Sequence, residues 1–152
     1  MNTDFSCPAR TDARSEALAN LCFRAALTFF GIGVAMGTFM SLTHDFTIRP
    51  VHVHVNLIGF VGFFIYGAFY RFFPASAATR LALAQVVCAL VGLPPMMTGL
   101  ALLVFGQESL GIPLLLGGEA VTVASVVMFL IVGFRATGRP ARIVAGDLAR
   151  AA

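Results

Sequence analysis

The sequence predicts an all-α fold, an integral membrane bundle of four helices in up-down order. Hydrophobic residues make up 59% of the 152 residues and charged residues only 11%, whereas soluble domains carry roughly 25% charged residues. Several apolar segments have the length of about 20 residues that crosses a bilayer. This composition disfavours a soluble enzyme, a nucleic-acid-binding protein and a disordered regulator.

Four segments meet the length requirement, and they are residues 25–42, 51–70, 81–105 and 110–134. The first three are uncharged, and the fourth contains the single charge of Glu119. The links between them are short, and short links indicate antiparallel neighbours. Pro50 precedes the second segment directly, where its missing N–H suits the first helical turn.

We place the membrane domain at residues 21–137 and expect a polar tail before it and another after it in the sequence. Residues 1–20 contain charges where a signal peptide would have an apolar core, so we interpret them as a polar cytoplasmic tail. Residues 138–152 form a second tail that contains arginines. The three cysteines are scattered and indicate neither a disulfide framework nor a metal knuckle.

The arginines predict the orientation. All ten basic residues are arginines, and nine of them fall in the N-terminal region, the 71–80 link or the C-terminal tail. An even number of spans places these three regions on one side, and Arg49 alone on the other. Because arginine-rich connections stay in the cytoplasm, both termini should be cytoplasmic.

Polar residues in the 51–70 span form one helical stripe. At about 100° per residue the spacing aligns His52, Asn56, Gly59, Phe63, Tyr66 and Tyr70. The opposite face carries Ile58, Val61 and Ile65, so we expect the stripe to point inward and that face to meet lipid. His54 lies about 200° from His52, so one metal cannot bind both on an undistorted helix.

Other candidate ligands lie at a similar depth. They are Met36 and Met40 in the first span, Met96 and Met97 in the third, and Glu119 in the fourth. Pro94-Pro95 precedes the second methionine pair and should break or kink that helix. Each methionine alone is better explained by core packing. An ionised Glu119 in lipid would cost several kcal/mol, so we expect it to be protonated, paired or hydrated.

The run Arg49-Pro50-Val51-His52-Val53-His54-Val55-Asn56-Leu57, continued to Tyr70, resembles the second transmembrane helix of the catalytic subunit of heme–copper oxidases and nitric oxide reductases. That resemblance implies an axial histidine for a b-type heme near the outer membrane face. The Arg-Pro-x-His spacing selects His52 and the His-x-Asn spacing selects His54, and both stay candidates. The chain also resembles short four-helix bacterial membrane proteins with the His-x-His-x-Asn-Leu-x-Gly motif, which implies the bacterial inner membrane.

The chain departs from that family in its ligand count. The other three spans contain no histidine, so one copy cannot build a complete oxidase site. A second axial ligand to the heme would be one of the four methionines Met36, Met40, Met96 and Met97, or His44 folding back, or a histidine from another subunit. Asn56 would orient a ring or ligand, and Arg49 would hold the heme propionates, although a plain interfacial arginine explains it equally well.

The predicted function is therefore heme b binding for electron transfer or for binding O2 or NO, with enzymatic activity left open. One alternative is a heme-free copper site or another metal site, and another is a structural or assembly subunit of a respiratory complex. We expect lipid, a homo-oligomeric partner and a respiratory redox partner, and no nucleic acid. Glycines in every span indicate either close helix packing or room for a flat macrocycle.

Overall fold

The structure, a computed structural model, describes residues 8–138, and within that range its regular elements are all helical. They are α1 (Pro8–Thr43), α2 (Arg49–His54), η1 (Val55–Gly62), α3 (Phe63–Phe72), α4 (Pro74–Ala77), α5 (Arg80–Val104) and α6 (Glu108–Thr137). The elements α2, η1 and α3 follow one another without a break and form one long helix. Residues 1–7 and 139–152, which include most of the expected C-terminal tail, lie outside the described residues.

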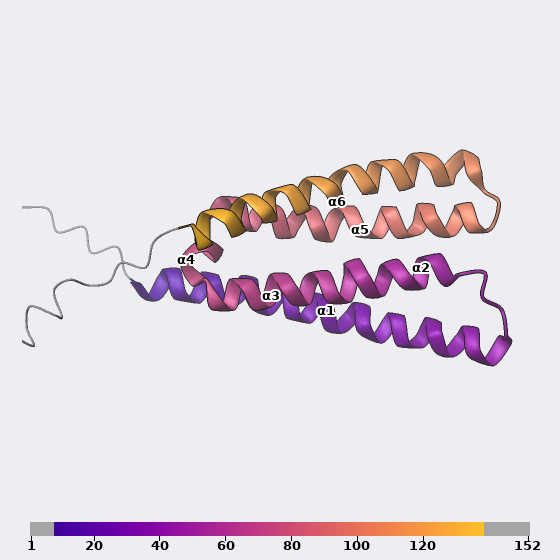
Figure 1. Ribbon diagram of the computed structural model, residues 1–152, viewed down its shortest axis with the longest axis horizontal. Coiled ribbons are helices and arrows are strands. Elements are labelled where there is room, and N and C mark those ends of the chain that lie inside the picture. The colour runs from indigo at the N-terminus through magenta and orange to yellow at the C-terminus, as the bar shows by residue number, and fades with distance from the viewer. Residues whose placement is uncertain (1–7, 139–152) are drawn as a thin grey trace, which may run out of the picture.

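The four expected spans are confirmed. Four helices are long and apolar enough to cross a membrane, and they run antiparallel (Figure 1). Large apolar side chains cover their outer surfaces; Leu42 and Phe134, for example, are 79% and 75% exposed. Lipid is the solvent that suits such a surface, so the chain is a multi-pass membrane protein. Helix α1 already begins at Pro8, within the expected tail, and its 36 residues extend over about 54 Å.

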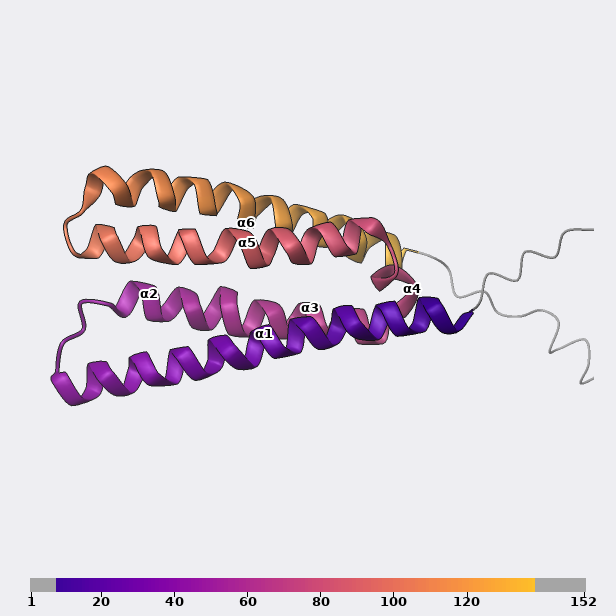
Figure 2. The ribbon, with the colours of Figure 1, turned by 180° about the vertical axis from the view of Figure 1, so that it is seen from behind.

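The bundle consists of two hairpins. Helix α1 pairs with the helix formed by α2, η1 and α3, and α5 pairs with α6 more extensively than any other two elements. The short α4 connects the hairpins, and both views show α1 beginning and α6 ending at the same end as α4 (Figures 1 and 2). We call this the termini end, and we call the opposite end, where α2 begins, the far end.

Glycines set the close distance between helices. A Cβ atom on Gly118 would meet the backbone nitrogen of Met96, and one on Gly99 would meet the backbone nitrogen of Leu115. In the other hairpin, a Cβ atom on Gly59 would lie 2.7 Å from Cγ of Phe29. Neighbouring backbone and side chains thus occupy the space at these glycines, as close helix packing requires.

A buried hydrogen-bond network ties the hairpins together. The Tyr70 hydroxyl in α3 donates to Oε1 of Gln85 in α5 at 2.8 Å, and Nε2 of Gln85 donates to Oγ of Ser125 in α6 at 3.0 Å. Oγ of Ser125 in turn donates to the Gln85 carbonyl at 3.0 Å. All three residues are completely shielded. The network links three helices in a region where lipid offers no alternative partner.

Two local features differ from the expectations. Helix α5 continues through Pro94-Pro95 as one element, so the prolines do not break it, and the alternative expectation of a kink stays a prediction. Prolines are tolerated in membrane helices because neighbouring groups can satisfy the carbonyls that they leave free. The second difference is η1, a π-helical stretch with i→i+5 bonding, a form often found at functional sites.

Candidate functional site

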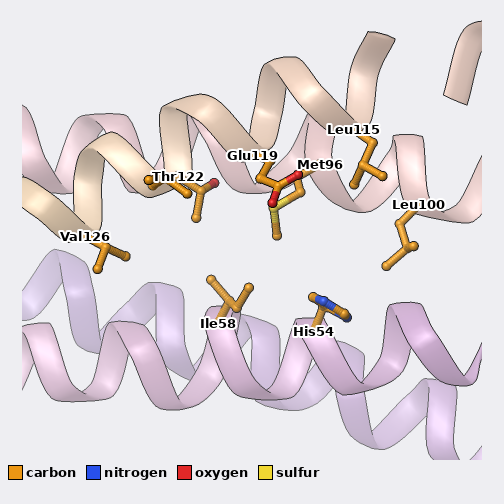
Figure 3. Close-up of a pocket in the computed structure, with 9 residues that line it drawn as sticks. His54, Ile58, Met96, Leu100, Leu115, Glu119, Thr122 and Val126 are labelled. Carbon is orange, nitrogen blue, oxygen red and sulfur yellow. The ribbon is translucent and has the colours of Figure 1, made fainter. Parts of the chain in front are cut away.

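A cavity of about 370 Å³ lies between the two hairpins. Figure 3 shows its side chains reaching toward one another from α2 and η1 on one side and from α5 and α6 on the other. The lining residues are His54, Ile58, Met96, Leu100, Leu115, Glu119, Thr122, Val123 and Val126. Most of the wall is aliphatic, and the few polar groups include an imidazole, a carboxyl and a hydroxyl. This combination is typical of small-molecule and cofactor sites.

His54 forms the far-end part of the α2 wall (Figure 3). Its Nδ1 lies 2.8 Å from the carbonyl oxygen of Pro50. A carbonyl can only accept a hydrogen bond, so Nδ1 carries a proton, and in the neutral imidazole the lone pair is then on Nε2. Metal-binding histidines are commonly fixed in this way, with one ring nitrogen bonded to a carbonyl and the other directed at the metal.

The α6 wall carries Glu119 and Thr122, which lie three residues apart on one helix face (Figure 3). Glu119 has no cationic partner within ion-pair distance among the described residues. The Thr122 side chain is buried, and its hydroxyl has no hydrogen-bond partner in the part of the chain that the structure describes. Thr28, Thr98 and Thr137 each donate to the carbonyl four residues earlier. The Thr122 hydroxyl instead lies against α5, where a Cβ atom on Gly92 would be 2.8 Å from its Oγ1, so it is an unpaired polar group between the two paired helices.

The methionines divide between the cavity and the core. Met96 is buried and contributes to the cavity wall from α5 (Figure 3). Met97 and Met40, two of the four expected axial candidates, are also buried, but neither lines this cavity. Met36 is partly buried against the core.

Two expected contributors lie outside the cavity, near the far end. The Arg49 guanidinium lies over the Phe46 ring, with Cζ 5.6 Å from its centroid, and does not line the cavity. His44 is exposed in the loop after α1, with a positive φ of 54°. The structure therefore does not bring either residue together with His54.

His52 and Asn56 face α1. A Cβ atom on Gly37 would lie 3.2 Å from Cε1 of His52, and one on Gly33 would meet the Asn56 amide. Nδ2 of Asn56 donates to the His52 carbonyl at 2.9 Å and lies 3.3 and 3.4 Å from the two ring nitrogens. These two side chains thus fill a gap between paired helices, apart from the cavity.

The prediction that the stripe points inward is confirmed for four of its residues, which are all buried: Gly59, Phe63, Tyr66 and Tyr70. The lipid-facing assignment of Ile58 is wrong, because Ile58 lines the cavity together with His54, four residues earlier. A helix inside a bundle contacts partners on two faces, and the sequence interpretation considered only one. Thr122 was missed, although its spacing from Glu119 places both on one face.

Within residues 8–138, no three His, Cys, Asp or Glu side chains group closely enough to hold a metal ion. The cavity supplies two such residues, His54 and Glu119, with the Met96 thioether as a further donor. Comparisons with protein-family models, with curated proteins and with solved structures find no match for this chain.

Proposed function

We propose that the chain is a membrane protein that binds a metal centre through Nε2 of His54 in the cavity between the hairpins. The preferred cofactor is heme b, used for electron transfer or for binding a diatomic gas such as O2 or NO. The observation that carries the proposal is the hydrogen bond from Nδ1 of His54 to the Pro50 carbonyl, because it leaves Nε2 free beside the cavity. The resemblance of the surrounding segment to an oxidase heme-binding helix supports the choice of heme.

The residues around the cavity fit a heme by their chemistry. Histidine and methionine both serve as axial ligands of heme iron, and His54 and Met96 lie on opposite walls (Figure 3). The aliphatic lining suits an apolar macrocycle. The volume of about 370 Å³ is toward the lower end of the range of ligand cavities. When bound, the heme would supply one-electron redox chemistry and an iron for gas binding, while this chain binds, orients and shields it.

A metal ion without heme is the second candidate, and the shared position of His54 and Glu119 favours it. An imidazole with a carboxylate suits iron or zinc, and an imidazole with the Met96 thioether suits copper. In this case Glu119 would bind the metal as a carboxylate, whose negative charge the ion would compensate.

An absorption spectrum of the purified protein, before and after dithionite, separates these candidates. A Soret band that changes on reduction is expected for heme. Stoichiometric metal by elemental analysis without that band supports the ion. The absence of both would leave a structural or assembly subunit and would refute the metal proposal.

Paired variants test the assignment of the ligand. His54→Ala should abolish the cofactor band or the bound metal, because it removes the nitrogen beside the cavity. His52→Ala is the matched control, since its ring packs on α1, and it should retain the cofactor with at most a shifted band. Size-exclusion chromatography and circular dichroism confirm that both variants fold. Loss of the cofactor in His52→Ala alone would contradict the assignment to His54.

The resemblance to short bacterial membrane proteins supports a location in the bacterial inner membrane. The arginine distribution supports a cytoplasmic position for both termini, so that the cavity lies toward the outer leaflet. A C-terminal reporter that is active only in the cytoplasm tests this orientation. The shortage of ligands within one chain supports a homo-oligomer, and a heme used for electron transfer would exchange electrons with a respiratory redox partner. Cross-linking in native membranes tests the homo-oligomer.

A further inference from the structure

A second cavity, of about 210 Å³, lies at the termini end, where α4 meets the start of α5 and the last turns of α6. Its lining residues are Ala75, Ser76, Thr79, Leu81, Val132 and Arg135. The cavity therefore combines one guanidinium and two hydroxyl groups with an aliphatic floor. It is separate from the His54 cavity, with which it shares no residue.

The charge at this cavity is positive and uncompensated. Arg135 is exposed, and the structure, over the residues it describes, gives it no acidic partner. Arg80 begins α5 beside this cavity and likewise has no acidic partner in the described range. At the same end, Glu16 already pairs with Arg71 at 3.7 Å. The positive end of the α5 dipole adds to this potential.

The hydroxyl groups have different roles. Oγ1 of Thr79 accepts from the Ala82 N–H at 3.2 Å and donates to the Ser76 carbonyl at 2.8 Å, so its proton is already used to cap α5. Within the part of the chain that the structure describes, the Ser76 hydroxyl has no hydrogen-bond partner, and it lines the cavity with Arg135. A guanidinium and a hydroxyl donor together suit the oxygens of a phosphate group.

We propose that this cavity binds the phosphate of an anionic membrane lipid, with Arg135 as the main contact and Ser76 as a second donor. The position supports a lipid as the source of the phosphate. Arg135 lies in the last turn of α6 and Leu81 in the first turn of α5, so the cavity is at the depth where membrane spans meet the headgroups. Basic pockets between transmembrane helices commonly hold acidic lipid headgroups in this way.

Native mass spectrometry of the full-length protein in mild detergent tests the proposal, with phosphatidylglycerol and phosphatidylcholine as probes. We expect phosphatidylglycerol to be retained preferentially, and Arg135→Gln to weaken its binding roughly fivefold, the effect of one arginine near an anionic surface. Ala75→Trp should weaken it as well, because the exposed Ala75 borders the cavity and a large ring would fill it without changing the charge.

Arg14→Gln is the matched control, since Arg14 is an exposed arginine at the same end but does not line this cavity. It should leave the preference intact. Equal weakening in Arg14→Gln and Arg135→Gln would overturn the proposal in favour of diffuse attraction. Inorganic phosphate, added to protein in phosphatidylcholine nanodiscs, distinguishes the source. Binding of inorganic phosphate without retention of phosphatidylglycerol would also overturn the lipid assignment.

Discussion

Replacing Gln85 by leucine tests whether the buried polar network holds the hairpins together. Gln85 accepts from Tyr70 and donates to Ser125 through its side chain. Leucine is similar in size and cannot form either bond. The bond from Ser125 to the backbone carbonyl of residue 85 can persist, so the substitution removes the contacts made by the side chain alone.

The expected loss follows from the number of bonds. Interhelical hydrogen bonds in membrane proteins contribute about 0.6 kcal/mol on average and up to about 1.7 kcal/mol each. Two bonds therefore predict that the free energy of unfolding falls by about 1 to 3 kcal/mol. The hydroxyl of Tyr70, which is fully buried, also loses its partner, and this loss favours the upper part of the range.

Thiol labelling of Cys22 measures this change, because Cys22 is completely shielded from solvent. In a background with Cys7→Ser and Cys88→Ser, a maleimide reaches the remaining thiol only when the bundle opens. A fall of 1 to 3 kcal/mol should raise the labelling rate from roughly fivefold to over a hundredfold. Gln107→Leu is the matched control, since Gln107 is exposed and makes no side-chain cap bond.

The reasoning would be refuted if Gln85→Leu and Gln107→Leu labelled at the same rate. A second result bears on the cavity. Because the network links α3, α5 and α6 by hydrogen bonds, its loss should also weaken the proposed binding of a cofactor by His54. The spectrum of any cofactor that remains bound should stay unchanged.

Two further predictions concern the packing of α6 at Gly118 and the Asp45 carboxylate in the loop after α1. Gly118→Ala should lower the free energy of unfolding by about 1 to 3 kcal/mol, because its Cβ would meet the Met96 backbone, whereas Gly117→Ala has open space and should be neutral or slightly stabilising. Equal labelling of Cys22 in both variants would contradict the close packing of α5 and α6. The pKa of Asp45 lies below its ordinary value of 3.8, because the Thr47 hydroxyl and then the Thr47 N–H donate to its carboxylate. The ionised Asp45 carboxylate therefore contributes fully to the order of this loop above pH 3.8. This contribution is lost as the pH falls through the lowered pKa. Hydrogen exchange at Thr47 should accelerate in that acid range, and Asp45→Asn should show no such pH dependence.

The spans could be predicted because length and apolar composition are local properties of a segment. The stripe through Phe63, Tyr66 and Tyr70 could be predicted for the same reason, since helical spacing alone places these side chains on one face. The sequence also indicated Glu119 as an unusual charge inside a span. Each of these features depends on residues a few positions apart.

The remaining features depend on contacts between distant segments. The partners of Gln85 lie 15 and 40 residues away, and no local pattern selects them. The inward position of Ile58 depends on the second hairpin, whose helix α5 contacts both α2 and η1. The position of His54, and not His52, beside the cavity depends on the same arrangement.

The two-hairpin design has a mechanical consequence for the His54 cavity. Backbone contact at the glycines makes α5 and α6 a stiff pair, and side chains seated on Gly33 and Gly37 do the same for the other pair. Any change in the width of the cavity must therefore come from a rigid-body rotation of one hairpin relative to the other about the termini end, where α4 connects them. Lateral pressure from the surrounding acyl chains should oppose that movement, so we expect bilayer composition to influence the affinity of the proposed His54 site for its ligand and micelles to weaken it.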